Sequence, residues 1–169
     1  MGPLELSRLN APAPLSSRHH LDSFRCSEPS LERWLKERAR KNEAEGASRT
    51  YVVSVEDVVI GYYCLSAGAV ARGSTPSGLR RNMPDPIPVI ILGRLAVHLD
   101  YTGRGIGEGL LKDAVLRSFQ ISEELGVRAL LCHAISESAK SFYLKRGFIE
   151  SPVDPMTVML SLSTLGTQD

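Results

Sequence analysis

The sequence predicts an α/β fold in which helices flank a mixed central sheet, and three features lead to this prediction. Ile87–Val97 is almost continuously apolar and rich in branched residues, as expected for a buried central strand. A loop with three alternating glycines, Gly103–Gly107, follows it and opens a long helix. Arg128–Ile135 then supplies a second apolar strand. A strand, a helix and a strand in this order predict a right-handed crossover that joins two parallel strands.

Composition is that of an ordinary globular chain. Its 169 residues are 43% hydrophobic and 23% charged, which predicts one domain, residues 1–169, around a single core. A net charge of +1 gives no strong nucleic-acid signal. Met1–Asn10 has no apolar signal region, and no apolar run approaches the ~20 residues that cross a bilayer.

The three cysteines, Cys26, Cys64 and Cys132, are odd in number and far apart in the sequence. This argues against a disulfide framework and against a zinc site, and it fits a reducing cytosol. We therefore expect a cytoplasmic protein with no metal, whose cysteines act mainly as small buried side chains.

Three strands are expected in the first half of the chain. Met1–Arg18 should hold a strand and then an irregular stretch, with its leucines packed on a sheet edge: Leu4, Leu6 and Leu9. Arg49–Val55 alternates and is rich in Val, Thr and Tyr, which predicts a strand. A turn at Glu56-Asp57 would join it to Val58–Ala69, the second strand of a hairpin.

A helix is expected between these strands. Ser27 can cap its start, and Pro29 suits its first turn. Apolar side chains at helical spacing mark its buried face: Leu31, Trp34, Leu35 and Ala39. Gly46 ends the helical region. Lys36 and Arg40 lie on other faces, either as a solvated surface or as contacts to a polyanion.

Ala71–Pro88 is expected to be a long loop, since it contains four prolines and two glycines and lacks periodicity. Loops of this length inside a compact domain are usually functional or mobile. Arg80 and Arg81 lie in it, and they either serve solubility or contact substrate phosphates.

The long helix after the glycine loop should end at Gly126 and bury one stripe of side chains. This stripe comprises Leu110, Ala114, Ile121 and Leu125, and it is widened by Leu111, Val115 and Phe119. Ser136–Arg146 is a second helix, capped by Ser136 and closed by Gly147. Phe148–Glu150 and Thr157–Leu162 are expected as closing strands.

The glycine loop has the chemistry of a phosphate cradle. Glycines let backbone N–H groups come close to a ligand, and a helix that starts there adds unpaired N–H groups and the positive end of its dipole. The Gly-Lys-Ser/Thr of a P-loop is missing, and the spacing differs from that of a dinucleotide fingerprint. An ordinary strand-to-helix turn is the structural alternative.

Two motifs resemble the GNAT superfamily of acyl-CoA N-acyltransferases. Thr102–Gly107 resembles its pyrophosphate loop, Gln/Arg-x-x-Gly-x-Gly/Ala, with Thr102 as a departure. Ala139–Phe148 resembles its Ala-x-x-Phe-Tyr-x-x-x-Gly-Phe motif and follows in the same order. The resemblance implies the GNAT fold and acetyl-CoA as co-substrate. The implied contacts to acetyl-CoA are Leu95, Ala96, Val97, Gly103, Arg104, Gly105, Ile106, Gly107, Glu108, Ser138 and Phe142.

The resemblance also implies a role for Tyr143. An amine attacks the acetyl carbonyl, a thiolate leaves, and a phenol of pKa ~10 can protonate the departing sulfur. The strand end Arg94–Leu99 offers no carboxylate, only His98, which we expect to be an edge residue rather than a base. An α-amine of pKa ~7.7–8.0 needs less help than a lysine of pKa ~10.4, so an α-amino substrate is favoured.

Residues 15 to 162 further resemble the acetyltransferase toxins of bacterial toxin–antitoxin pairs, through segments such as Phe24-Arg25-Cys26, Arg80–Pro88 and Asp154-Pro155-Met156. This implies acetylation of the α-amino group of an aminoacyl-tRNA, which blocks translation. It also implies a homodimer and neutralisation by a ribbon-helix-helix antitoxin. Candidate tRNA contacts are Lys36, Arg40, Arg80, Arg81 and Arg94.

Two other functions stay open. The first is an acetyltransferase that acts on a small amine or a protein N-terminus, which would not need the Arg80-Arg81 loop. The second is a non-enzymatic acyl-CoA-binding or scaffold protein, against which the presence of Tyr143 argues.

Overall fold

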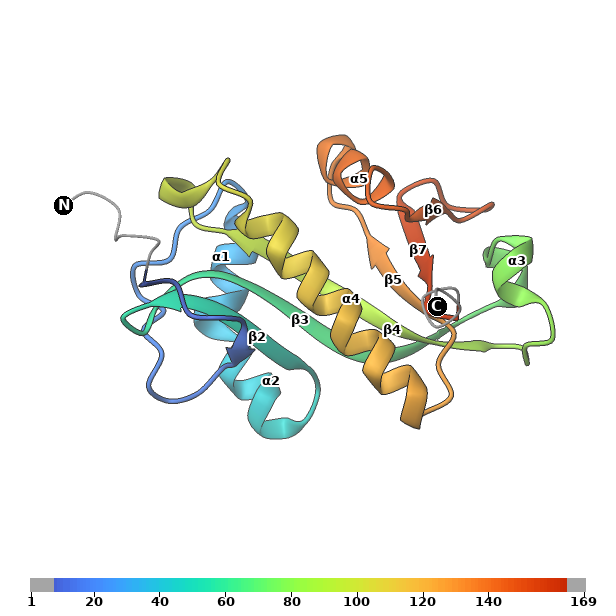
Figure 1. The fold of residues 1–169 in the computed structure, drawn as a ribbon, viewed down its shortest axis with the longest axis horizontal. Helices are drawn as coiled ribbons and strands as arrows, with labels where there is room; N and C mark the ends of the chain where they lie inside the picture. Colours follow the sequence, from blue (N-terminus) through green and yellow to red (C-terminus); the bar gives the residue numbers. More distant parts are fainter. Residues whose placement is uncertain (1–7, 164–169) are drawn as a thin grey trace. The chain divides into compact units, whose positions relative to one another are not determined.

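The computed structural model of the chain describes residues 8–163 (Figure 1). Leu4 and Leu6, which were expected at a sheet edge, lie outside the described residues. The helices are α1 (Pro29–Glu37), α2 (Ala39–Glu45), α3 (Ser77–Arg80), α4 (Ile106–Glu124) and α5 (Glu137–Leu144), with short 3₁₀ turns η2 (Arg72–Ser74) and η3 (Leu99–Tyr101). The strands are β1 (Ala13–Pro14), β2 (Arg49–Val55), β3 (Val58–Val70), β4 (Ile87–Val97), β5 (Ala129–His133), β6 (Ile149–Glu150) and β7 (Thr157–Ser161).

The strands form one mixed sheet of 7 strands in the order β1-β2-β3-β4-β5-β7-β6. β4 and β5 are parallel, with Val89 opposite Ala129 and Ile91 opposite Leu131. β5 and β7 are antiparallel. The mixed α/β fold and the parallel central pair are therefore confirmed. None of the helices within residues 8–163 is both long enough and apolar enough to cross a membrane.

By its contacts, the chain divides into two compact units. The first comprises Met1–Ser66 and Arg94–Ala114, and the second comprises Ala67–Gly93 and Val115–Asp169. Each unit is described below by itself. The expectation of a single domain stays a prediction.

The core of the first unit contains α1 and the β2–β3 hairpin. Trp34 and Leu35 are the buried residues of α1, and Tyr62 of β3 stacks on the Trp34 ring at 5.9 Å between centroids. The Tyr62 hydroxyl donates a 2.6 Å hydrogen bond to the carbonyl of Leu31. A buried phenol with a satisfied hydroxyl adds apolar area without an orphaned polar group.

Two expectations for the first helix were wrong. Glu28, not Ser27, is the N-cap residue of α1, and its side chain makes no capping hydrogen bond. Pro29 at the first position presets the helical backbone in place of a cap. The helical region is also split at Arg38 into α1 and α2. Gly46 ends α2 in the left-handed conformation, as expected, with φ 72°.

The hairpin prediction is confirmed. Val55 and Val58 are opposite each other, and the two residues between them, Glu56 and Asp57, have φ 51° and 65°. Positive φ at both central residues is the geometry of a tight turn that matches the twist of the flanking strands.

The core of the second unit lies on β4, β5 and β7, and its buried residues include Val89, Ala129, Leu131 and Met159. Ser136 caps α5 as expected, because its hydroxyl accepts a 3.1 Å hydrogen bond from the Ala139 N–H. The long loop of residues 71–88 is less irregular than expected, since it contains η2 and α3. Leu79 of α3 is buried, and this burial orders the segment.

The buried stripe expected on α4 is also only partly correct. Leu110 and Ala114 are fully buried, but Ile121 is 36% exposed and Leu125, just after the helix, is 61% exposed. Ile121 lies within about 20° of Leu110 around the helix, so the two share a face. The buried face instead continues from Ala114 to Ser118, which is also fully buried.

Candidate active site

The glycine loop has the backbone that its composition predicted. Gly103 and Gly105 have φ 76° and 80°, a conformation that side chains disfavour. A Cβ atom added at either position would meet nothing within 4 Å. Both glycines therefore serve the backbone conformation and an open approach to the loop, and neither is required by packing.

The start of α4 gives this loop its anion-binding character. The helix begins at Ile106 and extends for 19 residues, and its first N–H groups have no partner inside the helix. Arg104 is exposed, with its guanidinium 5.7 Å from the Tyr101 ring centre. A cavity of about 370 Å³ opens beside the loop, and it is lined by residues 9–12, Val53, Arg104, Gly105, Ile106, Gly109 and Leu110. The residues present fit a bound diphosphate.

The other expected acetyl-CoA contacts of the first unit are close in sequence to the loop. Ala96 is buried, while Leu95, Val97 and Gly107 are half-buried and Glu108 is exposed in the first turn of α4. The register of β4 with β5 runs only from Val89 to Ile91, so residues 95–97 lie beyond the last position of β4 that pairs with β5, while the other edge of β4 adjoins β3. Backbone groups beyond a paired segment can bond an extended ligand.

His98 is not placed as a base. Its Nδ1 accepts a hydrogen bond from the Asp100 N–H at 3.1 Å, and its Nε2 lies 3.0 Å from the Ser23 carbonyl. A neutral imidazole has one N–H and one lone pair, and these two contacts use both. The expectation that His98 is an edge residue agrees with this geometry.

Tyr143 is buried in the second unit, with 6% of its surface exposed. The rings of Phe142 and Phe148 both lie 5.3 Å from its ring centre, and the Cys132 side chain hydrogen-bonds its hydroxyl. Burial, followed by Cys132, raises the pKa of Tyr143 well above the ordinary value. The phenol therefore keeps its proton throughout the neutral range.

The other two candidates on α5 are more exposed. Ser138 lies in the first turn, with its hydroxyl 3.1 Å from that of Ser136. Phe142 is half-buried, and the Arg146 guanidinium covers its ring at 4.0 Å. Arg146 also donates a 2.8 Å hydrogen bond to the Phe142 carbonyl. These contacts hold the helix that carries the phenol.

A polar chain in the second unit was missed by the sequence analysis. The His133 imidazole Nδ1 lies 2.7 Å from the Thr157 hydroxyl, and that hydroxyl donates a 2.7 Å hydrogen bond to the Asp154 carboxylate. The register of β5 with β7 brings His133 opposite Thr157. No spacing in the sequence could have found this chain, because it depends on strand register.

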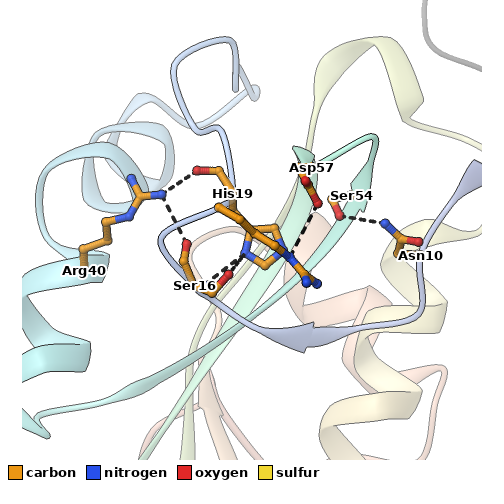
Figure 2. Close-up of polar contacts among 7 residues, drawn as sticks. Asn10, Ser16, His19, Arg40, Ser54 and Asp57 are labelled. Carbon is orange, nitrogen blue, oxygen red and sulfur yellow. Dashed lines mark hydrogen bonds and ion pairs between the residues drawn. The ribbon is translucent and has the colours of Figure 1, made fainter.

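Of the basic residues proposed for tRNA, Arg40 has contacts within its own unit. Figure 2 shows its guanidinium directed at the N-terminal segment, where it donates hydrogen bonds to the carbonyls of Ser16 and His19. Lys36 lies 3.7 Å from Glu32, one helical turn earlier. These contacts favour a structural role for Arg40 and a solvated ion pair for Lys36.

The other three basic candidates differ in exposure. Arg94 is half-buried, with its guanidinium 4.5 Å above the Trp34 ring. Arg80 is half-buried at the end of α3, and Arg81 is exposed at its C-cap. Lys36 and Arg40 are exposed as well, but both have the contacts described above.

Comparison with known proteins gives one family. The acetyltransferase (GNAT) domain model matches residues 46–150. The tRNA-acetylating toxin of Mycobacterium tuberculosis (strain ATCC 25618 / H37Rv) is 43% identical over 155 residues, covering 92% of this chain and 93% of that relative.

Solved structures are similar over nearly the full chain. AtaT complexed with acetyl-methionyl-tRNAfMet has a TM-score of 0.87 at 25% identity, covering 94% of this chain and 97% of that one. A mutant of AtaT bound to the C-terminus of the antitoxin AtaR has a TM-score of 0.81 at 25% identity, covering 95% and 98%. The matched family domain, residues 46–150, contains both motifs found in the sequence.

Proposed function

The chain belongs to the acetyltransferase (GNAT) family, and from this premise we propose that it is a toxin that acetylates aminoacyl-tRNA. Acetyl passes from acetyl-CoA to the α-amino group of the amino acid, which blocks translation in the cytoplasm. The observation that carries the proposal is the 43% identity to a tRNA-acetylating toxin over nearly the whole of both chains. The family resemblance and the fold expected from the two motifs are confirmed.

Residues of each unit fit a part of acetyl-CoA. In the first unit, Gly103 and Gly105 expose amides in front of the α4 N-terminus, which suits a diphosphate. In the second unit, Tyr143 offers a protonated phenol. We assign these residues the roles of phosphate binding and of general acid, together with the other expected contacts on β4, α4 and α5.

The reaction requires few proton transfers from the protein. An α-amine that has lost its proton attacks the acetyl carbonyl, and a thiolate must leave. Tyr143 donates its proton to the sulfur as the carbon–sulfur bond breaks. The nitrogen loses a proton as the amide forms, and the phenol is restored.

We also propose the partners that the resemblance implied. These are a homodimer and a ribbon-helix-helix antitoxin encoded beside the toxin. Support for an antitoxin comes from AtaT, whose mutant was solved with the C-terminus of AtaR. Size measurement by light scattering, with and without the co-expressed neighbour, tests both partners.

The test of function is direct. Purified protein is incubated with acetyl-CoA and a mixture of charged tRNAs, and the tRNA-linked amino acids are identified by mass spectrometry. Acetyl groups on α-amines of particular aminoacyl-tRNAs are expected. No acetylation of any charged tRNA, together with turnover on a small amine or a protein N-terminus, would replace this proposal with the broader acetyltransferase function.

A further inference from the structure

The segment Asp154-Pro155-Met156 contributed only to the family resemblance in the sequence analysis. In the structure, its Asp154 takes part in a chain of hydrogen-bonded polar side chains. The Asp154 carboxylate accepts hydrogen bonds from the Met156 N–H at 3.0 Å and from the Thr157 hydroxyl at 2.7 Å. The Thr157 hydroxyl lies 2.7 Å from Nδ1 of His133. Carboxylate, hydroxyl and imidazole thus follow one another across the start of β7 and the end of β5.

The direction of these hydrogen bonds fixes the state of the imidazole. The Thr157 hydroxyl and the Met156 N–H lower the pKa of Asp154, so this group is a carboxylate at neutral pH and can only accept. The single hydroxyl proton of Thr157 is therefore given to Asp154. The contact between Thr157 and His133 then needs an N–H on Nδ1. A neutral His133 consequently carries its lone pair on Nε2.

His133 also lies beyond the last residue of β5 that pairs with β4. The parallel pairing of β5 with β4 ends at Leu131, whereas the pairing of β5 with β7 continues to His133. Cys132, between them in sequence, hydrogen-bonds the Tyr143 phenol. Neighbouring side chains of a strand point to opposite faces, so the phenol bonded to Cys132 and the imidazole of His133 lie on the two faces of the end of β5. The His133 side chain is exposed.

We propose that His133 is a further catalytic residue, the group that takes the proton from the α-ammonium of the acceptor. This inference rests on the proposed function. The thioester is polarised on the phenol face of β5, and the amine approaches from the imidazole face. Histidine is the side chain that most often serves as a base near neutral pH, and a fixed Nδ1–H partner orients it for that task.

The protons balance in this scheme. The ammonium gives one proton to Nε2 of His133, and the freed lone pair forms the bond to the acetyl carbon. The carbon–sulfur bond breaks, and the sulfur takes the proton of Tyr143. The new amide nitrogen loses its remaining extra proton to the phenolate. The exposed imidazole releases its proton to water, so each acetyl transfer releases one proton overall.

The charged groups around the imidazole on the neighbouring elements are few. Asp154 precedes β7, and Lys140 of α5 interacts with the same carboxylate. Lys140 is in turn paired with Glu150 of β6 at 2.7 Å. Asp154, Lys140 and Glu150 are thus the charged side chains next to this polar chain.

The experiment measures the pH dependence of acetyl transfer. The acceptor is an aminoacyl-tRNA analogue in which an amide replaces the ester, because the ester hydrolyses in alkali. The variants are His133→Gln, Thr157→Val and Thr157→Ser, and the control is His20→Gln, an exposed histidine in the other unit. Steady-state kcat/KM is followed from pH 6.5 to pH 9, and the Kd for acetyl-CoA is measured in parallel.

An α-amine is mostly protonated at pH 6.5 and mostly neutral at pH 9. His133→Gln should therefore lower kcat/KM by about tenfold at pH 6.5, with the difference nearly gone at pH 9 and acetyl-CoA binding unchanged. Thr157→Val should show a smaller loss of the same shape. Thr157→Ser and His20→Gln should match the unmodified protein.

Two results would overturn the inference in distinguishable ways. An equal loss at every pH in His133→Gln, or no loss at all, would remove His133 from proton transfer while leaving the function intact. Failure of the unmodified protein to acetylate the analogue at any pH would overturn the proposed function, and the role of His133 with it.

Discussion

At the scale of single residues, the environment of Tyr143 decides what the phenol can do. Burial among Phe142, Phe148 and Cys132 raises its pKa, so the hydroxyl is neutral wherever the enzyme works. A neutral phenol cannot serve as the base for the amine. Its remaining roles are hydrogen-bond donor and acid, and a departing thiolate needs both.

Tyr143→Phe should therefore separate binding from turnover. The ring keeps its contacts with Phe142 and Phe148, so acetyl-CoA should bind with unchanged Kd. The turnover should fall by about a hundredfold or more, because protonation of the leaving group is lost. Calorimetry and steady-state acetylation measure the two effects. Tyr51→Phe, whose ring stacks on Tyr63 at 5.1 Å, is the matched control, and a full rate in Tyr143→Phe would end the acid assignment.

His19 gives a second prediction at this scale. Its imidazole is 3% exposed, and burial, followed by the Arg18 charge, lowers its pKa from 6.5. Below pH 6.5 the unfolded chain binds a proton that the folded chain resists, so the free energy of unfolding should fall as pH falls from there. Thermal unfolding at several pH values between 7.5 and 5 measures this slope.

His19→Asn tests the assignment. An asparagine oxygen can accept from the Ser16 N–H, which lies 3.0 Å from Nδ1 of His19, but it does not titrate. The variant should show a flatter dependence on pH in that range. His20→Asn should keep the original slope, and a slope unchanged in His19→Asn would assign the effect to other groups.

At the scale of elements, the boundaries set by local chemistry could be predicted. Arg49–Val55 and Ile87–Val97 were expected as strands and are β2 and β4 at the same bounds, because alternation and apolar runs are properties of neighbouring residues. The partners of side chains could not be predicted. The contacts of Arg40 with the N-terminal segment and of His133 with Thr157 join residues far apart in the chain, and only the fold brings them together.

Two glycines four residues apart should respond to substitution in opposite ways. Gly105→Ala places a side chain at φ 80°, which costs about 1–2 kcal/mol or shifts the loop amides, and acetyl-CoA should bind more weakly. Gly109 lies within α4, where an added Cβ meets nothing within 4 Å. Gly109→Ala should thus stabilise the protein by about 0.5–1 kcal/mol, and because Gly109 also lines the cavity beside the loop, its effect on binding is measured too.

Chemical denaturation and calorimetric titration on both variants measure these effects. Equal acetyl-CoA affinity in Gly105→Ala and the unmodified protein would mean that the loop conformation does not serve the ligand. A loss of affinity in Gly109→Ala would extend the ligand site further along α4.

At the scale of the whole molecule, the net charge of the protein attracts a polyanion such as tRNA only weakly. The chain has 20 basic and 19 acidic side chains, so tRNA must be held by local placement of cations rather than by net charge. Of the candidates, Arg40 is committed to the Ser16 and His19 carbonyls and Arg94 lies over Trp34. Lys36 and Arg81 are exposed, and Lys36 is paired with Glu32, which leaves Arg81 at the C-cap of α3 as the candidate to test.

Arg81→Ala should raise the KM for aminoacyl-tRNA without changing the KM for acetyl-CoA. If Arg81 neutralises one phosphate, the slope of log affinity against log salt should become shallower by about 0.7–0.9. Arg40→Ala should leave that slope unchanged and instead lower the unfolding temperature, because it frees the N-terminal segment. Filter binding across a salt series, with thermal unfolding alongside, distinguishes the two. If Arg81→Ala has the same slope as the unmodified protein, Arg81 does not contact the tRNA. A shallower slope in Arg40→Ala would assign the tRNA contact to Arg40 on α2.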